Sequence, residues 1–353
     1  AIHILTKHAR ATQGTLMTSG GGSEERGFAT LRYGGQMGEN LYYRLYTKGF
    51  ARDHSFSPMG TNDNSRMGTV GFRVDWDVNT NNAVTFQGQY YGGKAGQNTT
   101  FVNPVEPELA ITRVEDANLS GGHALARWQR TTGDRSNTVL QAYYDHTRRD
   151  ELSFRESRHT VDIDFQQRFP LQIPFVPFSQ DIVWGGGYRW TMDHLGGGLP
   201  IFFDPARRNL QTGNVFAQTD IPLIEDRLKL AVGIKFLDNT YAHANFLPNA
   251  RLLWTPDAKQ SIWASATRSI RLPSRFERDG NQLIRDGAEF IRLISNPHLT
   301  SETLWGFETG YRRQVTSDLS IDIAGFFNDY NNSTSEREIA PATIQITDQR
   351  HTQ

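Results

Sequence analysis

The chain has 353 residues, no cysteine, and 37 basic against 38 acidic residues, so its formal net charge is −1. A nucleic-acid-binding protein normally carries a basic surplus or stripe, because phosphate contacts supply most of its affinity; we therefore predict no nucleic-acid partner. The lack of cysteine excludes disulfide frameworks and thiolate metal sites. A mean hydropathy of −0.55 and the absence of a long apolar run exclude a transmembrane helix, whereas membrane-spanning strands need apolar side chains only at alternate positions.

The predicted elements are strands from the first residues onward. Residues 2–7 (IHILTK) are rich in β-branched side chains, residues 12–14 are expected to open the next strand, and residues 23–35 form another. Residues 70–78 and 227–236 alternate apolar and polar side chains with period two. If this alternation belongs to a membrane barrel, the apolar side faces outward and the polar side inward. The predicted outward set is Val70, Phe72, Val74, Leu228, Leu230 and Val232, and the predicted inward set is Arg73, Asp75, Lys229 and Lys235.

Connections between these strands differ in length in a regular way. Short polar turns are predicted at residues 36–39, 79–82, 132–135, 256–259 and 315–318, and longer segments rich in Gly, Asn or Pro at 54–66, 93–117, 194–210 and 269–299. Bacterial outer-membrane barrels have short turns at one end and long loops at the other. We therefore expect 93–117 and 269–299 at one end and 79–82 and 256–259 at the other. A soluble sheet wetted on one face would alternate in the same way.

Aromatic residues near the predicted strand ends are compatible with the girdles that barrels place at the two membrane interfaces. Ordinary core or surface positions are the other interpretation. The residues are Tyr42, Tyr43, Tyr90, Tyr91, Trp254, Trp263, Phe326, Phe327 and Tyr330.

Two motifs in the second half of the chain are more specific than the alternation. ATRSIRLPSR (266–275) ends a predicted strand, and NPHLTSETLWGFETGYR (296–312) returns from the long segment that follows. Together they resemble the barrel of TonB-dependent outer-membrane receptors. The matching positions are Thr267, Arg268, Arg271, Pro273, Asn296, Pro297, Leu299, Glu302, Thr303, Glu308, Gly310 and Tyr311. Residues 215–223 and 247–268 match further strands of that barrel, and residues 2–7 are similar to the last strand of the family's plug domain.

The resemblance implies an all-β fold: an antiparallel transmembrane β-barrel of the plugged transporter type, integral to the bacterial outer membrane. About fifteen strands are predicted, against about 22 in plugged transporters, so we expect a truncated and incompletely closed barrel. Residues 1–11 would be the end of the plug and its linker, and 12–353 the partial barrel. The resemblance also implies uptake of a scarce nutrient, most often a ferric siderophore, driven by the TonB–ExbB–ExbD complex, with lipid bilayer and lipopolysaccharide around the wall. The energy-coupling segment is expected upstream of Ala1.

Catalytic and cofactor motifs are absent from the sequence. Residues 75–82 begin like a calcium loop but have Thr80 in place of the required Gly and Phe86 in place of the final Glu. The Gly-rich stretches at 20–23, 185–187 and 196–198 lack the Lys-Ser/Thr of a phosphate-binding loop, and the histidines show no metal-ligand spacing. We therefore predict no enzyme activity and no cofactor.

The long segment 269–299 carries the candidate ligand-binding residues. A guanidinium group suits carboxylates, phosphates and anionic metal chelates, because its fork donates two hydrogen bonds at once. The competing interpretation is local pairing with Glu277, Asp279, Asp286 or Glu289. Replacing Arg278, Arg285 and Arg292 together is expected to weaken ligand capture without preventing assembly. The candidates are Arg271, Arg275, Arg278, Arg285 and Arg292. A passive porin and a soluble β-rich binding domain remain open as alternatives.

Overall fold

The computed structural model describes residues 6–56, 60–102, 110–172, 179–198, 201–286 and 289–349, and strands dominate it. The only helical elements in these residues are the short 3-10 helix η1 (Ala9–Thr12) and α1 (Arg275–Asp279). The strands are β1 (Gly14–Gly20), β2 (Gly27–Met37), β3 (Leu41–Arg52), β4 (Ser65–Asn79), β5 (Asn82–Val102), β6 (Ala110–Thr131), β7 (Asn137–Asp150), β8 (Phe154–Leu171), β9 (Gln180–Gly197), β10 (Ile201–Phe203), β11 (Arg207–Ile224), β12 (Leu228–Asn239), β13 (Asn245–Asp257), β14 (Gln260–Arg271), β15 (Gly280–Asp286), β16 (Glu289–Ile294), β17 (Glu302–Gln314), β18 (Ser320–Asn331), β19 (Ser333–Ala340) and β20 (Thr343–Gln349).

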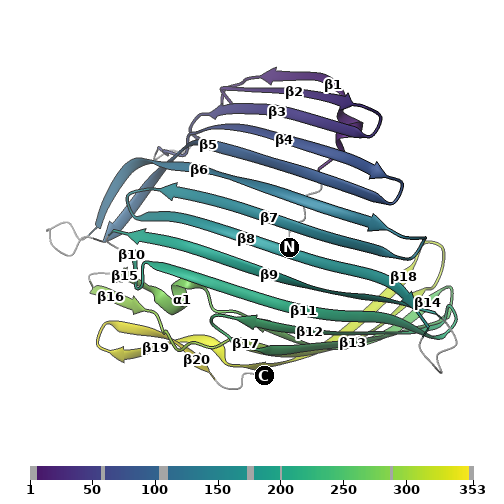
Figure 1. The fold of residues 1–353 in the computed structure, drawn as a ribbon. Coiled ribbons are helices and arrows are strands. Elements are labelled where there is room, and N and C mark those ends of the chain that lie inside the picture. Colours follow the sequence, from purple (N-terminus) through teal and green to yellow (C-terminus); the bar gives the residue numbers. More distant parts are fainter. Residues whose placement is uncertain are drawn as a thin grey trace.

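Fifteen strands form one antiparallel sheet in the order β1 to β9, β11 to β14, β17 and β18 (Figure 1). Each strand of this sheet therefore pairs with the strands of the same sheet that come before and after it in the sequence. The sheet curves into a wall whose two edge strands, β1 and β18, are not paired with each other in the described residues. The predicted all-β, antiparallel and incompletely closed barrel is confirmed. Successive hairpins satisfy the backbone groups of each strand through its neighbours, which is what a strand needs in lipid.

The register of the wall places the two predicted sets of side chains on opposite faces. Directly opposed residues share a face, and alternate residues along a strand share it too. The face of Val74 can therefore be followed across the wall through Phe86, Ala126, Ala142, Ile163, Tyr188 and Gly213. Its neighbour Val215 opposes Phe236, on the same face as Val232, Leu230 and Leu228. Arg73, Asp75, Lys229 and Lys235 occupy the alternate positions, so the predicted division of faces is confirmed.

The apolar face is the exposed one. Val70, Ile163 and Val215 are 54%, 47% and 59% exposed, although they would be buried in the interior of a water-soluble protein of this size. An apolar belt along the middle of one face of a long sheet is what a lipid-facing barrel wall requires.

The predicted aromatic girdles are only partly right. Adjacent residues of a strand point to opposite faces, so the pairs Tyr42/Tyr43, Tyr90/Tyr91 and Phe326/Phe327 cannot both face lipid. The register turns Tyr43, Tyr90, Trp254 and Phe327 outward, and Tyr42, Tyr91, Trp263, Phe326 and Tyr330 inward.

The connections lie at the predicted ends. Residues 80–81 and 258–259 turn at one end of the wall. At the other end, called the loop end below, β5 ends at Val102 and β6 begins at Ala110, and β14 ends at Arg271 and β17 begins at Glu302. Much of 93–117 is not loop, however, because β5 runs to Val102 and β6 begins at Ala110. Two pairs of strands also depart from the length rule. Residues 151–153 form a short turn at the loop end, and at the short-turn end β8 ends at Leu171 whereas β9 begins only at Gln180.

A second sheet of five strands, in the order β10-β15-β16-β20-β19, lies at the loop end (Figure 1). The sequence did not predict it. It gathers three segments that leave the wall separately: the β9–β11 connection, the β14–β17 connection and the chain after β18. Within the described residues, the cluster of buried apolar side chains also lies here, formed by Leu293, Leu299 and Ile346 with Phe276 and Ile344 against it.

Candidate functional site

The inward face of the wall is polar, and the first described residues lie against it. The Ala9 backbone N–H donates to Asp75 Oδ2 at 2.7 Å, and Arg44 Nη1 donates to the Lys7 carbonyl oxygen at 3.0 Å. A Cβ at Gly34 would come within 2.1 Å of the Thr12 carbonyl oxygen, so this glycine permits the close approach. The inside of the wall thus binds the N-terminal segment through backbone groups.

Only part of the predicted boundary between plug and barrel lies within the described residues. Residues 1–5, and with them most of the predicted strand 2–7, lie outside the described residues. The chain from Thr6 leads into η1, and the first wall strand begins at Gly14, two residues later than predicted. The division into residues 1–11 and 12–353 stays a prediction.

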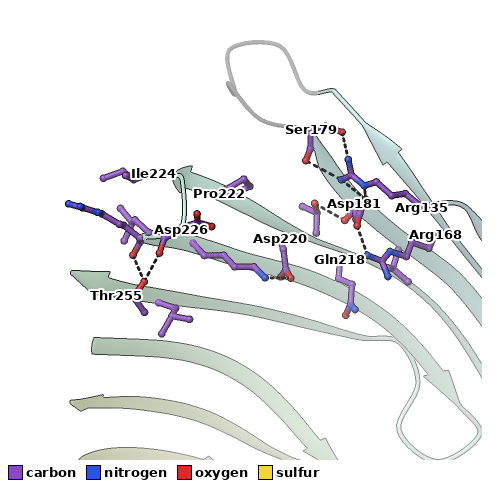
Figure 2. Close-up of a pocket in the computed structure, with 16 residues that line it drawn as sticks. Arg135, Arg168, Ser179, Asp181, Gln218, Asp220, Pro222, Ile224, Asp226 and Thr255 are labelled. Carbon is purple, nitrogen blue, oxygen red and sulfur yellow. Dashed lines mark hydrogen bonds and ion pairs between the residues drawn. The ribbon is translucent and has the colours of Figure 1, made fainter. Parts of the chain in front are cut away.

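A charged groove lies on the inward face at the short-turn end (Figure 2). Arg135 and Arg168 both pair with Asp181, and Lys229 pairs with Asp220. Because these cations already have carboxylate partners, the groove offers few free donors for an anionic ligand. Its position is also opposite to the end from which the long loops emerge.

The loop end is organised around α1, which begins with a capping box. The Ser274 hydroxyl accepts from the Glu277 N–H at 3.2 Å, and the Glu277 carboxylate accepts from the Ser274 N–H at 2.6 Å. Burial alone would raise the pKa of Glu277, but the Arg271 guanidinium and the Ser274 N–H outweigh it and lower the pKa. The helix start is therefore fixed by a charged carboxylate.

Arg275 projects from α1 into a buried ion cluster. Its Nε donates to both carboxylate oxygens of Asp193 on β9, at 3.1 and 3.0 Å, and its Nη1 donates to Asp279 at 2.5 Å. Its Nη2 donates to the Pro205 carbonyl oxygen at 2.8 Å. Arg275, Asp193 and Asp279 are 8%, 2% and 1% exposed. Burial would lower the pKa of Arg275, but the two carboxylates reverse that effect and raise it.

Asp279 extends this cluster to β11 and to the β12–β13 turn. It accepts hydrogen bonds from Arg208 on β11 and from the Tyr241 hydroxyl, the latter at 3.0 Å. Burial and the Asp279 carboxylate raise the pKa of Tyr241 above its ordinary value. Arg278 stacks on the Tyr241 ring at 4.7 Å and donates to the carbonyl oxygens of Tyr241 and Leu299. The loop is thereby fixed to β9, β11 and the β12–β13 turn.

The structure gives the predicted arginines different environments. Arg275 and Arg278 are engaged as just described. Arg271 pairs with Glu277 and Glu302 and donates to the Thr334 hydroxyl, so it links α1, β17 and β19. Arg292 is exposed on β16, with no hydrogen bond or ion pair of its side chain to another described residue. The side chain of Arg285 lies outside the description.

The three engaged arginines therefore follow the competing interpretation, local pairing, more closely than ligand contact. Sequence reasoning proposed Asp279 and Glu277 as partners, and the structure agrees. It missed Asp193, Arg208 and Tyr241, because no spacing signal connects α1 with residues 38 to 82 positions away in the sequence. Ligand binding by any of the five arginines stays a prediction.

Neither of the two described helical elements is long and apolar enough to cross a membrane. In the part of the chain that the structure describes, no group of three or more His, Asp or Glu side chains is arranged to hold a metal ion.

Comparison with known proteins identifies the wall. The family model of the TonB-dependent receptor-like β-barrel matches residues 11–349. No curated protein sequence matches the chain.

Several solved structures share the fold. The chain superposes on the siderophore receptor PirA from Pseudomonas aeruginosa with a TM-score of 0.71, 16% identity, and coverage of 92% of this chain and 57% of that one. For a mutant of the ferric enterobactin receptor PfeA from the same organism, the values are 0.69, 15%, 95% and 55%. For a double mutant of the Serratia marcescens hemophore receptor HasR, in complex with its hemophore and heme, they are 0.70, 12%, 95% and 58%.

This chain thus spans little more than half the length of these receptors. Its lipid-facing wall, its polar interior and the match over residues 11–349 agree, and the chain belongs to the family of TonB-dependent outer-membrane receptors, whose barrel it forms in part.

Proposed function

We propose that the receptor containing this chain takes up a ferric siderophore, using energy delivered by the TonB–ExbB–ExbD complex. The family consists of receptors and transporters rather than enzymes, and this replaces the passive porin and the soluble binding domain as interpretations. Two of the superposed structures are a siderophore receptor and a ferric enterobactin receptor, which supports this ligand class. No residue of the chain is assigned to contact with TonB.

The observation that carries the proposal is the small sheet at the loop end. Three connections that could move separately are joined by strand pairing, and α1 is tied to the wall beside them. Such a platform can present donors in fixed positions, which reduces the ordering cost of binding. The exposed Arg292 lies on this sheet and is free to donate to an anionic chelate.

Arg275 and Arg278 support this function indirectly as positioning residues. Their donors already bond to protein oxygens. Replacing Arg278 would therefore loosen the platform as well as remove a charge, so it is a poor probe of ligand contact. Arg292 and Arg285 are the better pair to change.

The test is equilibrium binding of ferric siderophores of the catecholate and hydroxamate classes, and of haem, to the purified full-length receptor. We expect one siderophore class to bind, and Arg285→Ala with Arg292→Ala to weaken it by about tenfold or more, the loss expected for charged hydrogen bonds. Arg313→Ala, an exposed arginine at the short-turn end of β17, is the matched control.

Heat-modifiable electrophoretic mobility reports the folded barrel in each variant. Binding of haem alone would overturn the siderophore assignment and leave the receptor assignment intact. Unchanged siderophore affinity in the double variant would remove Arg285 and Arg292 from the binding site.

A further inference from the structure

The five-stranded sheet at the loop end has two faces of different character. On one of them, called the packed face, Leu293 pairs with Ile344, and both belong to the apolar cluster that includes Phe276 of α1. On its other side, α1 is bonded through Arg275 to Asp193 of β9. Helix α1 therefore lies between the sheet and the wall, and the opposite face of the sheet, called the open face, is turned away from β9.

The open face carries two arginines that have no partner. Arg292 on β16 opposes Thr343 on β20, and Arg337 on β19 opposes Gln345, two residues further along β20. Opposed residues share a face, as do alternate residues of one strand, so both arginines lie on the open face. Both are exposed, and neither side chain makes a hydrogen bond or an ion pair with another described residue.

The carboxylates of β19 and β20 lie on the packed face instead. Glu336 opposes Ile346 and Glu338 opposes Ile344, so both acidic side chains turn away from Arg337 between them. Among the side chains of this sheet that the structure describes, the open face carries no carboxylate. The open face therefore has a surplus of positive charge with free donors.

Protection of a sheet edge does not explain this sorting by charge. An edge strand such as β19 often carries charges that prevent pairing with other chains, but charges of either sign on either face serve that purpose. The arginine that is engaged nearby shows the contrast. Arg271 donates to Glu277, to Glu302 and to Thr334, which the register places on the packed face opposite Asp348. Cations with carboxylate partners thus lie behind the sheet, whereas the open face is left to an anion from outside the chain.

The spacing of the two arginines suits a bulky anion. They are separated by two strand spacings across the sheet and by two residues along it, which places their Cα atoms about 12 Å apart. Two long side chains at this separation can reach one ligand that lies over β20. Thr343 and Gln345 lie between Arg292 and Arg337 and add uncharged polar groups.

We propose that the open face binds the imported chelate, with Arg337 as a ligand-contacting residue beside Arg292, and that the receptor thereby selects ferric complexes with a net negative charge. A ferric ion bound by three catecholate groups is such a complex, because each group supplies two negative charges. Bound by three hydroxamate groups the ion is neutral, because each group supplies one. Two guanidinium groups without a carboxylate favour the catecholate complex. This inference rests on the proposed function, which leaves the siderophore class open.

The test measures equilibrium binding of a ferric tris-catecholate and of a ferric tris-hydroxamate to the purified full-length receptor. Wild type should bind the tris-catecholate more tightly. Arg337→Gln should weaken binding of the tris-catecholate by about tenfold, and Arg292→Gln with Arg337→Gln by about a hundredfold, roughly tenfold for each charged contact. Arg337→Lys keeps the charge and should retain most of the affinity.

Glu338→Gln controls for disturbance of β19, because Glu338 follows Arg337 by one residue but lies on the packed face. It should leave the affinity for the tris-catecholate unchanged. Added salt should weaken binding of the tris-catecholate to wild type more than to the double variant, because it screens the charges that the variant lacks. Heat-modifiable mobility shows that each variant is folded.

The outcomes separate this inference from the proposed function. Unchanged affinity of the arginine variants for the tris-catecholate would overturn the inference and leave siderophore uptake intact. Tighter binding of the tris-hydroxamate by wild type would do the same. An equal loss in Arg337→Gln and Glu338→Gln would show a structural effect of β19 and would also overturn ligand contact by Arg337. Binding of neither complex would overturn the proposed function itself, and the inference with it.

Discussion

Replacing Arg275 by Met should release the loop that carries α1 while leaving the wall folded. The substitution keeps an unbranched apolar stem but removes the donors to Asp193, Asp279 and the Pro205 carbonyl oxygen. Asp279 keeps its contacts with Arg208 and Tyr241. Asp193, 2% exposed, loses both hydrogen bonds that its side chain accepts from Arg275. The main cost is therefore one buried, unpaired carboxylate.

Breaking a buried ion pair in this way costs about 3–5 kcal/mol. Since 1.36 kcal/mol corresponds to a factor of ten, the equilibrium for local opening of the loop should shift by between about two and almost four powers of ten. The wall should not unfold, because its strands are paired through backbone hydrogen bonds that do not involve Arg275.

The assay is amide hydrogen exchange of residues 275–284 and 289–299 in the full-length receptor, with exchange of β12 as the internal reference. Arg292→Met is the matched control, because Arg292 is an exposed arginine on β16 in the same connection between β14 and β17, and it should not change exchange. Adding Asp193→Asn to Arg275→Met should recover part of the protection, because the residue left unpaired is then neutral. Unchanged exchange in Arg275→Met would refute the view that this cluster fixes the loop.

Three other outcomes follow from the wall and the helix cap. Val232→Arg places a charge on the outward face and should impair assembly of the barrel in vesicles, because an arginine on the lipid face costs about 2–4 kcal/mol near the midplane. Ala231→Arg, on the inward face, should assemble. Equal yields of heat-modifiable barrel would contradict the face assignment. Asp75→Ala should release the N-terminal segment, because the Ala9 N–H loses its acceptor at a cost of about 1–3 kcal/mol, and proteolysis between Thr6 and Gln13 should accelerate. The pKa of Glu277 is lowered in the folded protein, so its stabilisation of α1 is complete above its ordinary pKa of about 4.3 and is lost as pH falls through the lower folded value. Hydrogen exchange of the loop should therefore rise in acid. This rise should be absent in Glu277→Gln.

The wall could be predicted from the sequence because the alternation of apolar and polar side chains is visible within each single strand. Alternation over 70–78 and 227–236 fixes the faces of Val74 and Val232 without knowledge of their partners, and one face of an entire strand must meet lipid. Strand ends were less predictable. The Gly- and Asn-rich residues after Gly93 resemble loop in composition, yet they continue β5, because β6 supplies a partner along its whole length.

The loop-end sheet and the ion cluster could not be predicted because both depend on contacts between residues that are far apart in the sequence. β10 pairs with β15, and β16 with β20, across tens of residues, and these strands are too short to show a period. Arg275 was recognised as a notable residue, but its burial depends on Asp193, which is 82 residues away. A sequence can show that an arginine follows a family motif; it does not show which strand end receives the side chain.

The two parts of this chain are consequently stabilised by different forces. In the wall, the apolar side chains face lipid, so cohesion comes from the ladders of backbone hydrogen bonds, and single side chains contribute mainly through their compatibility with one face. At the loop end, the strands are short and a few buried side chains carry the structure: Leu299, at 1% exposure, and the Arg275–Asp279 pair are examples. Single substitutions there can therefore open the loop without unfolding the wall. This combination suits a receptor, because the barrel must remain intact in the membrane while the order of its loop end depends on only a few side-chain contacts.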